Sequence, residues 1–544
     1  MLNRKAAGVL LVFAAALLIT GWHLDAAGIA APYSDPIAQL RAQDEAIYVN
    51  AAMRMARDGD WMTPHILGRV FLEKPPLLFW IAALSIRLFG LSLFAIRLPV
   101  LVLGAVGVAA IYAWCMAKRS IGAGILAAGL LVLSPFWEIF ARLYFTDIPA
   151  SAFAVLAMSA VAFDLRLERR LTPILFGLFG ALSILSKSVA GLLPFAALVL
   201  YWIFCTPAMR PRIARLAITG IAGVIVLAPW FVYQIVAHPQ WFWADYVQVQ
   251  LLGIGLQTGA DFPFSRSSTF YLSRMAQMDP VTGLLALLAI PGAIRELRAR
   301  RDPMVLLICC WIVVVAAGMF AFHTKNLPYL VLLMPPLCLL AGMYGPVWLS
   351  RDARVAAVLI VGLFAARMIV HGAPWSLRPA SSPLEGAAAM REYYALGRNT
   401  ELMSCDPDDQ FYSSTLPLPR VSYCFVDPHG VIARSFPHYA PLGIVIPAEQ
   451  FLILPSLAPQ FKQRLHEWRY DSTEPIASGV TLASPDQIAE ILRARPDMDF
   501  SLPASWAPFF GTTHEVWKAD HHVFLLSRTA PLRQRPVPAL PNPW

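Results

Sequence analysis

Charge is scarce in this 544-residue chain: only 14% of the residues are Asp, Glu, Lys or Arg, whereas 58% are hydrophobic. The mean hydropathy is +0.59. An ordinary soluble domain has about 25% charged residues. The composition therefore excludes a typical soluble enzyme and indicates a polytopic membrane protein. The net charge of +9 does not point to a nucleic-acid partner, because basic residues of such proteins concentrate in their cytoplasmic loops.

Cysteine and several sequence signatures are also sparse. Five of the seven cysteines lie in apolar runs, where a thiol behaves as a small buried hydrophobe: Cys115, Cys205, Cys309, Cys310 and Cys338. Cys405 and Cys424 fall in a polar region, and a disulfide between them is expected only if that region faces an oxidising compartment. The sequence contains no phosphate-binding glycine loop, no zinc-type Cys/His spacing and no internal repeat.

Long apolar runs are abundant instead. Eleven of them are plausible transmembrane helices, at 6–24, 98–116, 121–137, 148–163, 172–185, 189–204, 216–236, 281–294, 304–322, 327–349 and 355–370. We interpret run 6–24 as an uncleaved first span, although its charged start would also suit a signal peptide. A twelfth run, 77–89, is short for a span, which needs about 17 to 25 residues.

The basic clusters decide how the short run 77–89 is placed. These clusters are Arg4-Lys5, Lys118-Arg119, 166–170, 210–215, 295–301 and 351–354. If 77–89 lies flat at the membrane surface, all six clusters share one side, which the positive-inside rule makes cytoplasmic. The predicted topology has the N-terminus inside and the C-terminus outside. The loops 25–76, 138–147, 237–280 and 323–326 then lie outside, and we expect the aromatic loop 237–280 at the headgroup level.

The chain becomes polar near residue 371. We therefore predict two domains, a transmembrane domain over 1–372 and a small soluble α/β domain over 373–544. Short β-like runs are at 421–426, 443–447, 451–454 and 522–527, and helix-like stretches are at 385–396 and 485–493.

Lysine is rare, with 7 lysines against 36 arginines, so the positions of lysine are informative. Lys74, Lys187 and Lys325 occur at the predicted outer ends of apolar segments, against the positive-inside tendency. An ammonium group there suits a phosphate at the outer leaflet, although snorkelling towards lipid headgroups is an alternative.

Acidic residues and histidines occur in the same outer loops. Asp44-Glu45 could simply begin a helix, Glu73 could be a polar lead-in to 77–89, and Asp147 could be an N-cap. A divalent metal site formed by Glu73 with His65 and His323 is one hypothesis, and ordinary hydrogen-bonding histidines are the other.

These motifs resemble one enzyme family. Asp44-Glu45-x-x-Tyr48, Glu73-Lys74-Pro75, Ser186-Lys187-Ser188 and Lys325-Asn326-Leu327-Pro328-Tyr329 are similar to motifs of the GT-C membrane glycosyltransferases. The similar group is the protein O-mannosyltransferases (family 39), with their bacterial branch of lipid A aminoarabinose transferases. The resemblance covers about residues 6–349. Ser188 stands where the family has Gly, and Ile47 and Leu72 stand where the aminoarabinose branch has Arg and an aromatic residue. The sugar and the acceptor therefore stay open.

The resemblance implies a fold, a reaction and roles for residues. It implies a GT-C-type bundle of about 11 to 13 transmembrane helices with interfacial helices in the first outer loop. It implies transfer of a sugar from an undecaprenyl-phosphate-linked donor to lipid A, a glycan or a protein. The implied catalytic residues are Asp44, Glu45 and Asp147, and the implied substrate-binding residues are Glu73, Lys74, Tyr48, Lys187, Lys325 and Tyr329. Arg142 is a further candidate substrate-binding residue, because its charge could stabilise the leaving phosphate.

The charges that develop in such a reaction also fit the residue types present. Cleavage of the sugar C1–oxygen bond puts negative charge on the leaving phosphate, which lysines would stabilise. Asp44 would take the proton of an acceptor hydroxyl, and attack opposite the phosphate would invert the anomeric centre. If the acceptor is itself a phosphate, Asp44 would instead position the acceptor or a cation. The expected location is a bacterial inner membrane, with the site and C-terminal domain periplasmic. A lipid or glycan flippase without transferase chemistry is one alternative, although such transporters place charged sites near the bilayer midplane. A non-enzymatic assembly protein whose outer domain recruits other proteins is another.

Overall fold

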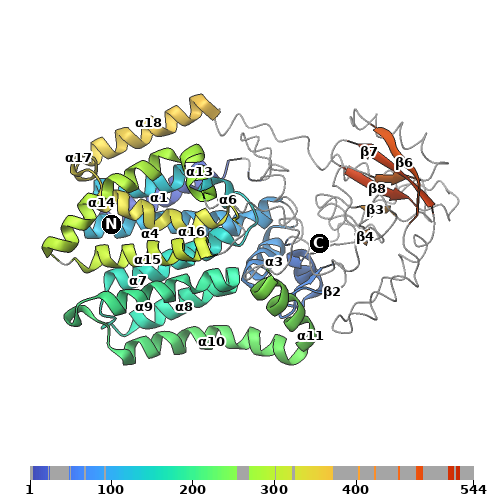
Figure 1. Ribbon diagram of the computed structural model, residues 1–544, viewed down its shortest axis with the longest axis horizontal. Helices are drawn as coiled ribbons and strands as arrows, with labels where there is room; N and C mark the ends of the chain where they lie inside the picture. Colours follow the sequence, from blue (N-terminus) through green and yellow to red (C-terminus); the bar gives the residue numbers. More distant parts are fainter. Residues whose placement is uncertain are drawn as a thin grey trace.

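The computed structural model describes residues 4–22, 24, 48, 51–66, 69–90, 93–253, 269–300, 302–321 and 325–371, and six strands beyond them. Up to residue 371 the chain forms a helix bundle (Figure 1). Its first half contains α1 (Arg4–Thr20), β1 (His65–Ile66), β2 (Arg69–Val70), α3 (Leu77–Phe89), α4 (Leu93–Lys118), α5 (Ile121–Leu133), α6 (Pro135–Ala141), α7 (Asp147–Phe163), α8 (Leu171–Lys187), η1 (Ser188–Leu192) and α9 (Leu193–Phe204).

The second half of the bundle follows the short helix η2 (Pro207–Met209). It consists of α10 (Ile213–Ala237), α11 (Pro239–Trp241), the π-helix η3 (Phe242–Gly253), α13 (Phe270–Met278), α14 (Pro280–Arg300), α15 (Pro303–Ala321), α16 (Tyr329–Tyr344), α17 (Val347–Arg351) and α18 (Ala353–His371).

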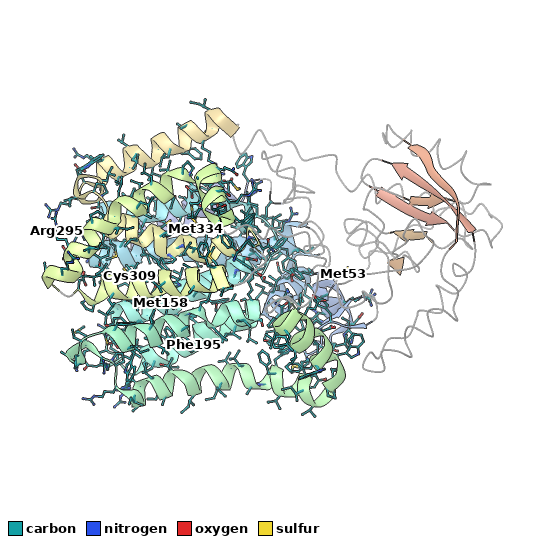
Figure 2. The ribbon with its side chains drawn as sticks, in the orientation of Figure 1. Met53, Met158, Phe195, Arg295, Cys309 and Met334 are labelled. Carbon is teal, nitrogen blue, oxygen red and sulfur yellow. The ribbon has the colours of Figure 1, made fainter. Side chains whose placement is uncertain are left out.

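Contacts between loops bring five of the six predicted basic clusters to one end of the bundle. The Ser120 hydroxyl donates to the Ser350 carbonyl (2.5 Å), which joins the α4–α5 and α16–α18 connections. Tyr344 donates to Asp302 (3.0 Å), and Arg215 donates to the Glu168 carbonyl (3.1 Å). We call this end the arginine end, and the other, which carries α3, η1 and η3, the site end. Arg295 and Met53 mark the two ends in Figure 2.

Helix α3 has the predicted bounds and does not cross the bundle. Near its start, the indole of Trp80 donates to the Trp61 carbonyl (2.5 Å). Near its end, Arg87 donates to the Ala56 carbonyl (2.9 Å) and lies over the Trp61 ring (5.1 Å). Because both halves contact the same short stretch, 56–61, the helix stays at the site end.

Five apolar helical stretches in the described part are long enough to cross a membrane, or six if the bent pair α5–α6 is one span. The longest of the five is Leu171–Phe204, and η1 interrupts it. A Cβ on Gly191 would lie 2.3 Å from the Cα of Ile184, seven residues earlier. A continuous helix would separate these positions by about 10 Å at 1.5 Å per residue. Helices α8 and α9 therefore form a hairpin, as predicted for runs 172–185 and 189–204.

The predicted helix 121–137 is broken in the structure. Helix α5 ends at Leu133, Ser134 is extended, and α6 starts at Pro135 with a bend of 62°. Proline lacks the amide hydrogen that would continue the helix, and its ring disfavours helical backbone at the preceding residue. The break turns α6 into the site end, where it leads to Asp147.

The bundle core is made of large rings and small residues. The indoles of Trp114 and Trp311 stack with 6.5 Å between ring centroids. Cys115, Cys205, Cys310 and Cys338 are buried free thiols, as the apolar runs predict, whereas Cys309 is partly exposed. Cys405 and Cys424, and with them their possible disulfide, lie outside the described residues.

The strands near the C-terminus form a six-stranded sheet with the order β4-β3-β8-β7-β5 and with β6 paired to β7. The strands are β3 (Leu402–Ser404), β4 (Ser422–Tyr423), β5 (Phe451–Ile453), β6 (Thr473–Thr481), β7 (Thr513–Ala519) and β8 (His522–Leu526). Three of the predicted β-like runs contain β4, β5 and β8. The fourth run, 443–447, and both predicted helical stretches lie outside the described residues, and the domain boundary at 372/373 stays a prediction.

Candidate functional site

Two of the predicted site residues form an ion pair at the site end. Asp147 is the first residue of α7, and Lys187 is the last residue of α8. Their side chains are 2% and 15% exposed, and the Lys187 ammonium contacts the Asp147 carboxylate directly. The same ammonium lies over the ring of Tyr329, 5.0 Å from its centroid. The structure therefore brings Asp147, Lys187 and Tyr329 together from three helices.

The backbone turns sharply directly after Lys187. Ser188 has φ +49° and ψ −127°. Glycine adopts this backbone conformation easily, whereas a residue with a side chain adopts it only with strain. The resemblance places a glycine at this position in the family. Here the serine hydroxyl has a use, because it donates a hydrogen bond to the Tyr246 hydroxyl (2.9 Å). This turn aims Lys187 at Asp147 and Ser188 at η3.

Lys74 belongs to a second group of contacts. Its ammonium donates to the side-chain carbonyl of Gln250 (2.5 Å), and the lysine is half-buried. Gln250 is neutral, and no carboxylate of a described residue forms an ion pair with Lys74. A positive charge is thus held in place without being neutralised by the described part of the chain.

Glu73 and Leu72 fix the segment that carries Lys74. Glu73 is buried at 9% exposure. The amide of Leu72 donates to the carboxylate of Asp245, which is completely buried (3.1 Å). Since an unpaired buried amide or carboxylate would cost free energy, this contact defines where the Glu73-Lys74 segment lies.

The π-helix η3 joins these two groups, and sequence reasoning missed it. Asp245 holds Leu72, Tyr246 holds Ser188, and Gln250 holds Lys74. π-Helical turns are rare and often occur at functional sites. The loop containing η3 was expected at the headgroup level, and this stays a prediction: Trp241, Tyr246 and Tyr271 are buried in the protein, whereas Trp243 is 53% exposed. The available signal was the polar residues Asp245 and Gln250 within an aromatic, apolar segment.

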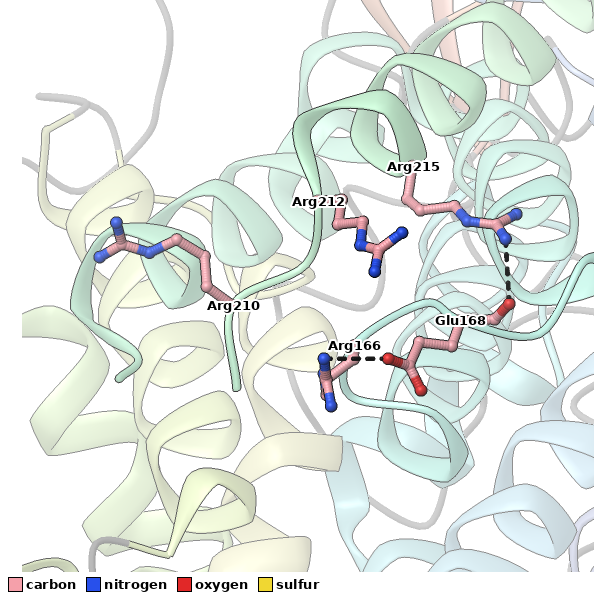
Figure 3. Close-up of a pocket in the computed structure, with 5 residues that line it drawn as sticks. All are labelled: Arg166, Glu168, Arg210, Arg212 and Arg215. Carbon is pink, nitrogen blue, oxygen red and sulfur yellow. Dashed lines mark hydrogen bonds and ion pairs between the residues drawn. The ribbon is translucent and has the colours of Figure 1, made fainter. Parts of the chain in front are cut away.

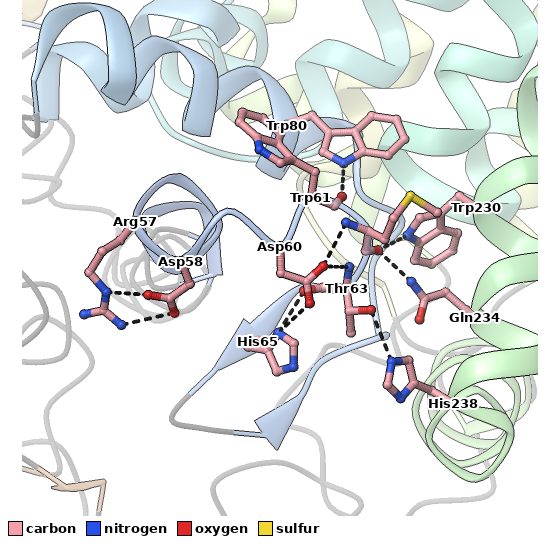
Figure 4. A network of polar contacts seen from close by, with 11 residues as sticks. Arg57, Asp58, Asp60, Trp61, Thr63, His65, Trp80, Trp230, Gln234 and His238 are labelled. Atoms are coloured by element: carbon pink, nitrogen blue, oxygen red, sulfur yellow. Dashed lines mark hydrogen bonds and ion pairs between the residues drawn. The ribbon is translucent and has the colours of Figure 1, made fainter.

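A polar network anchors the stretch from residue 57 to residue 65, in the predicted first outer loop, to α10 and α3 (Figure 4). Asp60 accepts hydrogen bonds from the amides of Met62 and Thr63 (3.1 and 3.0 Å). The Met62 carbonyl in turn accepts from the side chains of Trp230 (2.9 Å) and Gln234 (2.6 Å). The loop between the helical residues 51–58 and the Glu73-Lys74 segment is therefore held on both sides.

His65 and His238 lie in this network. The His65 ring donates through Nδ1 to the Thr63 carbonyl (2.8 Å), with Asp60 3.8 Å away. His238 bonds the Thr63 hydroxyl through Nε2 (3.2 Å). Burial, and then the nearby His65, lower the pKa of His238, and Asp60 opposes this shift. Within the described residues no three His, Cys, Asp or Glu side chains are grouped to hold a metal, and His323 lies outside those residues.

Other predicted site residues have structural partners. Tyr48 is buried, with its ring 6.1 Å from that of Phe79 and 6.2 Å from that of Phe145. Arg142 donates to the Trp22 carbonyl (2.7 Å) and lies 3.9 Å from Glu138. The Arg142 contacts tie the loop before Asp147 to α6 and to the residues that follow α1.

Lys325 caps a helix. Its ammonium donates to the carbonyls of Met319 (3.2 Å) and Phe320 (3.0 Å) in the last turn of α15, where a cation is favoured by the helix dipole. Burial lowers the pKa of Lys325. The predicted phosphate-binding role of Lys325 therefore stays a prediction beside an observed capping role. Asp44 and Glu45 lie outside the described residues.

Comparison with known proteins confirms the family resemblance. The model of the dolichyl-phosphate-mannose-protein mannosyltransferase family matches residues 73–256, which begin at Glu73 and include Lys74, Asp147, Lys187 and all of η3. A curated relative from Sodalis glossinidius, an undecaprenyl phosphate-alpha-4-amino-4-deoxy-L-arabinose arabinosyl transferase, is 30% identical over 317 residues. A Pseudomonas aeruginosa relative with the same description is 28% identical over 324 residues.

Each of these two matches covers about half of both chains: 56% of this chain and 54% of the Sodalis protein, and 55% and 54% for the Pseudomonas protein. The chain also resembles the crystal structures of ArnT from Cupriavidus metallidurans. The apo form aligns with a TM-score of 0.57 at 18% identity, covering 95% of this chain and 98% of that one. The form bound to undecaprenyl phosphate aligns with a TM-score of 0.56 at 17% identity, covering 94% and 98%. The chain is thus a multi-pass membrane protein with the GT-C fold of ArnT.

Proposed function

We propose that this chain transfers a sugar from a polyprenyl-phosphate-linked donor to an acceptor at the membrane surface, with its site among Lys74, Asp147, Lys187 and η3. The descriptions of the relatives support this reaction class, since they name an undecaprenyl-phosphate-linked sugar donor. One solved structure of the same fold is bound to undecaprenyl phosphate.

One observation carries the proposal: the half-buried ammonium of Lys74 is positioned by a neutral amide and not by a carboxylate of a described residue. The leaving group of the reaction is a phosphate, whose negative charge grows as the C1–oxygen bond breaks. An ammonium already fixed nearby stabilises that charge without having to reorganise. The ammonium of Lys74 is therefore positioned to bind an anion, and among the described residues no carboxylate takes that place.

Asp147 and Lys187 contribute differently to the proposed reaction. Their charges compensate each other, so this pair adds little net charge and mainly fixes the start of α7 and the end of α8 beside Tyr329. Asp44 is proposed as the base that takes the proton of an acceptor hydroxyl. Reaction opposite the phosphate would invert the anomeric carbon.

The location and the acceptor are parts of the same proposal. Because the basic loops gather at the arginine end, the positive-inside rule places that end in the cytoplasm and the site end at the periplasmic face of an inner membrane. Lipid A is the acceptor suggested by the aminoarabinose transferases. Glycan and protein acceptors are tested in the same experiment.

The flippase alternative is less well supported. Transporter sites lie near the bilayer midplane, often where helices are interrupted. The described site contacts lie instead at helix ends, as for Asp147 at the start of α7 and Lys187 at the end of α8.

The test uses full-length protein in proteoliposomes with a radiolabelled polyprenyl-phosphate sugar, measuring release of polyprenyl phosphate and transfer to lipid A, glycan or protein. Lys74→Ala should lower turnover about 100-fold or more, the effect expected when one stabilising donor at a developing negative charge is lost. Asp44→Asn should also abolish transfer. Lys118→Gln, which removes an ammonium at the arginine end, should retain turnover.

The outcome distinguishes the alternatives. Turnover unchanged in both Lys74→Ala and Asp44→Asn would contradict the proposed mechanism. Movement of the lipid across the bilayer without cleavage of its sugar bond would identify a flippase.

A further inference from the structure

The arginine end contains a cavity of about 240 Å³ that the proposed reaction does not use (Figure 3). This volume is far larger than the 10–15 Å³ that one water needs. The lining comes from two connections, α7–α8 and α9–α10, and from the first turn of α10. The lining residues are Arg166, Glu168, Arg210, Arg212 and Arg215.

The charges around this cavity are unbalanced. The lining residues carry four guanidinium groups and one carboxylate, which gives the lining a formal charge of +3. Glu168 is paired with Arg166 (3.0 Å), and Arg215 donates to the Glu168 backbone carbonyl (3.1 Å). The side chain of Arg212 forms no hydrogen bond or ion pair with any described residue. Like charges gathered around one space repel each other, and an anion would relieve that repulsion.

Hydrogen bonds and a buried leucine hold the loop that carries Arg166 and Glu168 in place. Asp164 accepts hydrogen bonds from the amides of Glu168 (3.1 Å) and Arg169 (2.8 Å). Leu167, between the two cavity residues, is fully buried and has φ +55°, an uncommon conformation for a residue with a branched side chain. Burial of Leu167 and the Asp164 contacts therefore hold Arg166 and Glu168 on the cavity side.

Arg210 differs from the other three arginines. Its guanidinium lies over the Trp202 ring (5.0 Å) and donates to the carbonyls of Ile203 (3.3 Å) and Cys205 (3.5 Å). Figure 3 shows it turned away from Arg166, Arg212 and Arg215, whose side chains surround the open space. Three arginines are therefore available to an anion there.

The surface next to the cavity is apolar and exposed. Helix α10 starts directly after Arg212, and its spanning window is only 17% buried, the lowest value among the five candidate spans of the described part. Ile213, Ile221 and Ile225 are 72%, 60% and 66% exposed. A molecule with a phosphate in the cavity could thus lay hydrocarbon chains along α10.

We propose that this cavity binds the phosphate group of an anionic membrane lipid, with Arg212, Arg166 and Arg215 as the binding residues and α10 as the support for its acyl chains. Guanidinium groups match phosphate oxygens with paired, planar hydrogen bonds. Basic pockets between transmembrane helices are known to recognise lipid headgroups. A free phosphate ion has the same headgroup chemistry but would gain nothing from α10.

The positive-inside rule alone does not explain this arrangement. That rule requires basic residues at one end of the bundle, whatever the direction of their side chains. Arg295 meets it equally well on α14, where it is exposed and is not part of the cavity lining (Figure 2). Arg295→Gln is therefore a matched control that removes the same charge from the same end.

The experiment uses delipidated full-length protein in detergent. Binding of short-chain phosphatidylglycerol, short-chain phosphatidylcholine and inorganic phosphate is measured by native mass spectrometry and by the shift in unfolding temperature. Phosphatidylglycerol should bind the native protein about tenfold or more tightly than Arg212→Gln, since a hydrogen bond to a charged group has about that effect. Arg212→Lys, which keeps the charge but not the planar fork, should be intermediate.

The control lipids and variants decide the outcome. Phosphatidylcholine should bind equally weakly to all variants, and Arg295→Gln should bind phosphatidylglycerol like the native protein. Equal losses in Arg212→Gln and Arg295→Gln, or no preference for phosphatidylglycerol over phosphatidylcholine, would overturn the proposal. Arg212-dependent binding of inorganic phosphate alone would overturn the lipid assignment and identify a free-anion site. Because lipid binding is the readout, the result does not depend on sugar transfer.

Discussion

The two ends of the bundle use basic residues in opposite ways. At the site end, lysines are at least half-buried and each has a defined partner: Asp147 for Lys187, Gln250 for Lys74 and the last carbonyls of α15 for Lys325. At the arginine end, Arg166, Arg212 and Arg295 are exposed. Several other positively charged residues lie near them in the sequence. Buried, individually held cations suit chemistry on a charged group, whereas exposed ones suit orientation in the membrane and contact with lipid headgroups.

The ion pairs of the two ends provide the sharpest test of this difference. Asp147→Asn leaves Lys187 without its partner in a pair that is 2% and 15% exposed, and should cost about 3–5 kcal/mol of stability. Glu168→Gln breaks a pair that is 46% and 58% exposed, and should cost about 1 kcal/mol or less. Unfolding titrations in mixed micelles measure both values.

A double variant shows whether the cost comes from an unpaired buried charge. Asp147→Asn with Lys187→Met removes both charges and should be more stable than Asp147→Asn alone, because no buried ammonium is left unpaired. Equal costs for the Asp147 and Glu168 variants would remove the energetic distinction between the two ends.

Each end also has one non-glycine residue with positive φ in the described part, Ser188 at the site end and Leu167 at the arginine end. Ser188→Ala loses the hydrogen bond to the buried Tyr246 hydroxyl while keeping the strained backbone, and should cost about 1–3 kcal/mol. Ser188→Gly loses the same bond but relieves the strain, so it should be about 1 kcal/mol more stable than the alanine variant.

The same relief is not expected at the arginine end. Leu167→Gly would remove a fully buried leucine, which should cost about 2–5 kcal/mol and outweigh any gain from the backbone. Unfolding temperatures of the three variants measure the order. If Ser188→Gly were less stable than Ser188→Ala, Ser188 would not be strained in the way its φ indicates.

Much of the bundle follows from the sequence because apolar runs with polar ends are local signals. Run 77–89 became α3 with the same bounds, and run 148–163 became α7 with one residue added at its start. The break in run 121–137 was not predicted, although Ser134-Pro135 is a local signal for it. Hydrophobicity alone does not distinguish one straight helix from two helices that bend at a proline.

The site was predictable as a set of residues but not as a set of contacts. Asp147 and Lys187 were both expected at the same face, yet they are 40 positions apart, and only the packing of α7 on α8 shows that they pair. Asp245, Tyr246 and Gln250 were missed because their aromatic neighbours suggested a segment at the headgroup level. Tertiary burial decides whether such a segment faces the membrane surface or the protein, and burial is not a property of the segment alone.

The smallest expected effect concerns pH, and it also separates the two ends, because guanidinium groups stay charged at all ordinary pH values. Burial and the neighbouring His65 lower the pKa of His238 below the usual value of about 6.5, against the opposing effect of Asp60. The folded protein therefore resists protonation of His238, and between the two pKa values the unfolded chain binds more protons. The stability that His238 contributes is present above pH 6.5 and is lost as the pH falls through the window below it.

The unfolding temperature should decrease between pH 7.5 and pH 5, and His238→Gln should make that decrease smaller. Arg295→Gln, the control at the arginine end, should leave the pH dependence of the unfolding temperature unchanged. If the unfolding temperature decreased equally in the native protein and in His238→Gln, protonation of His238, which contacts Thr63, would not be the cause of the decrease.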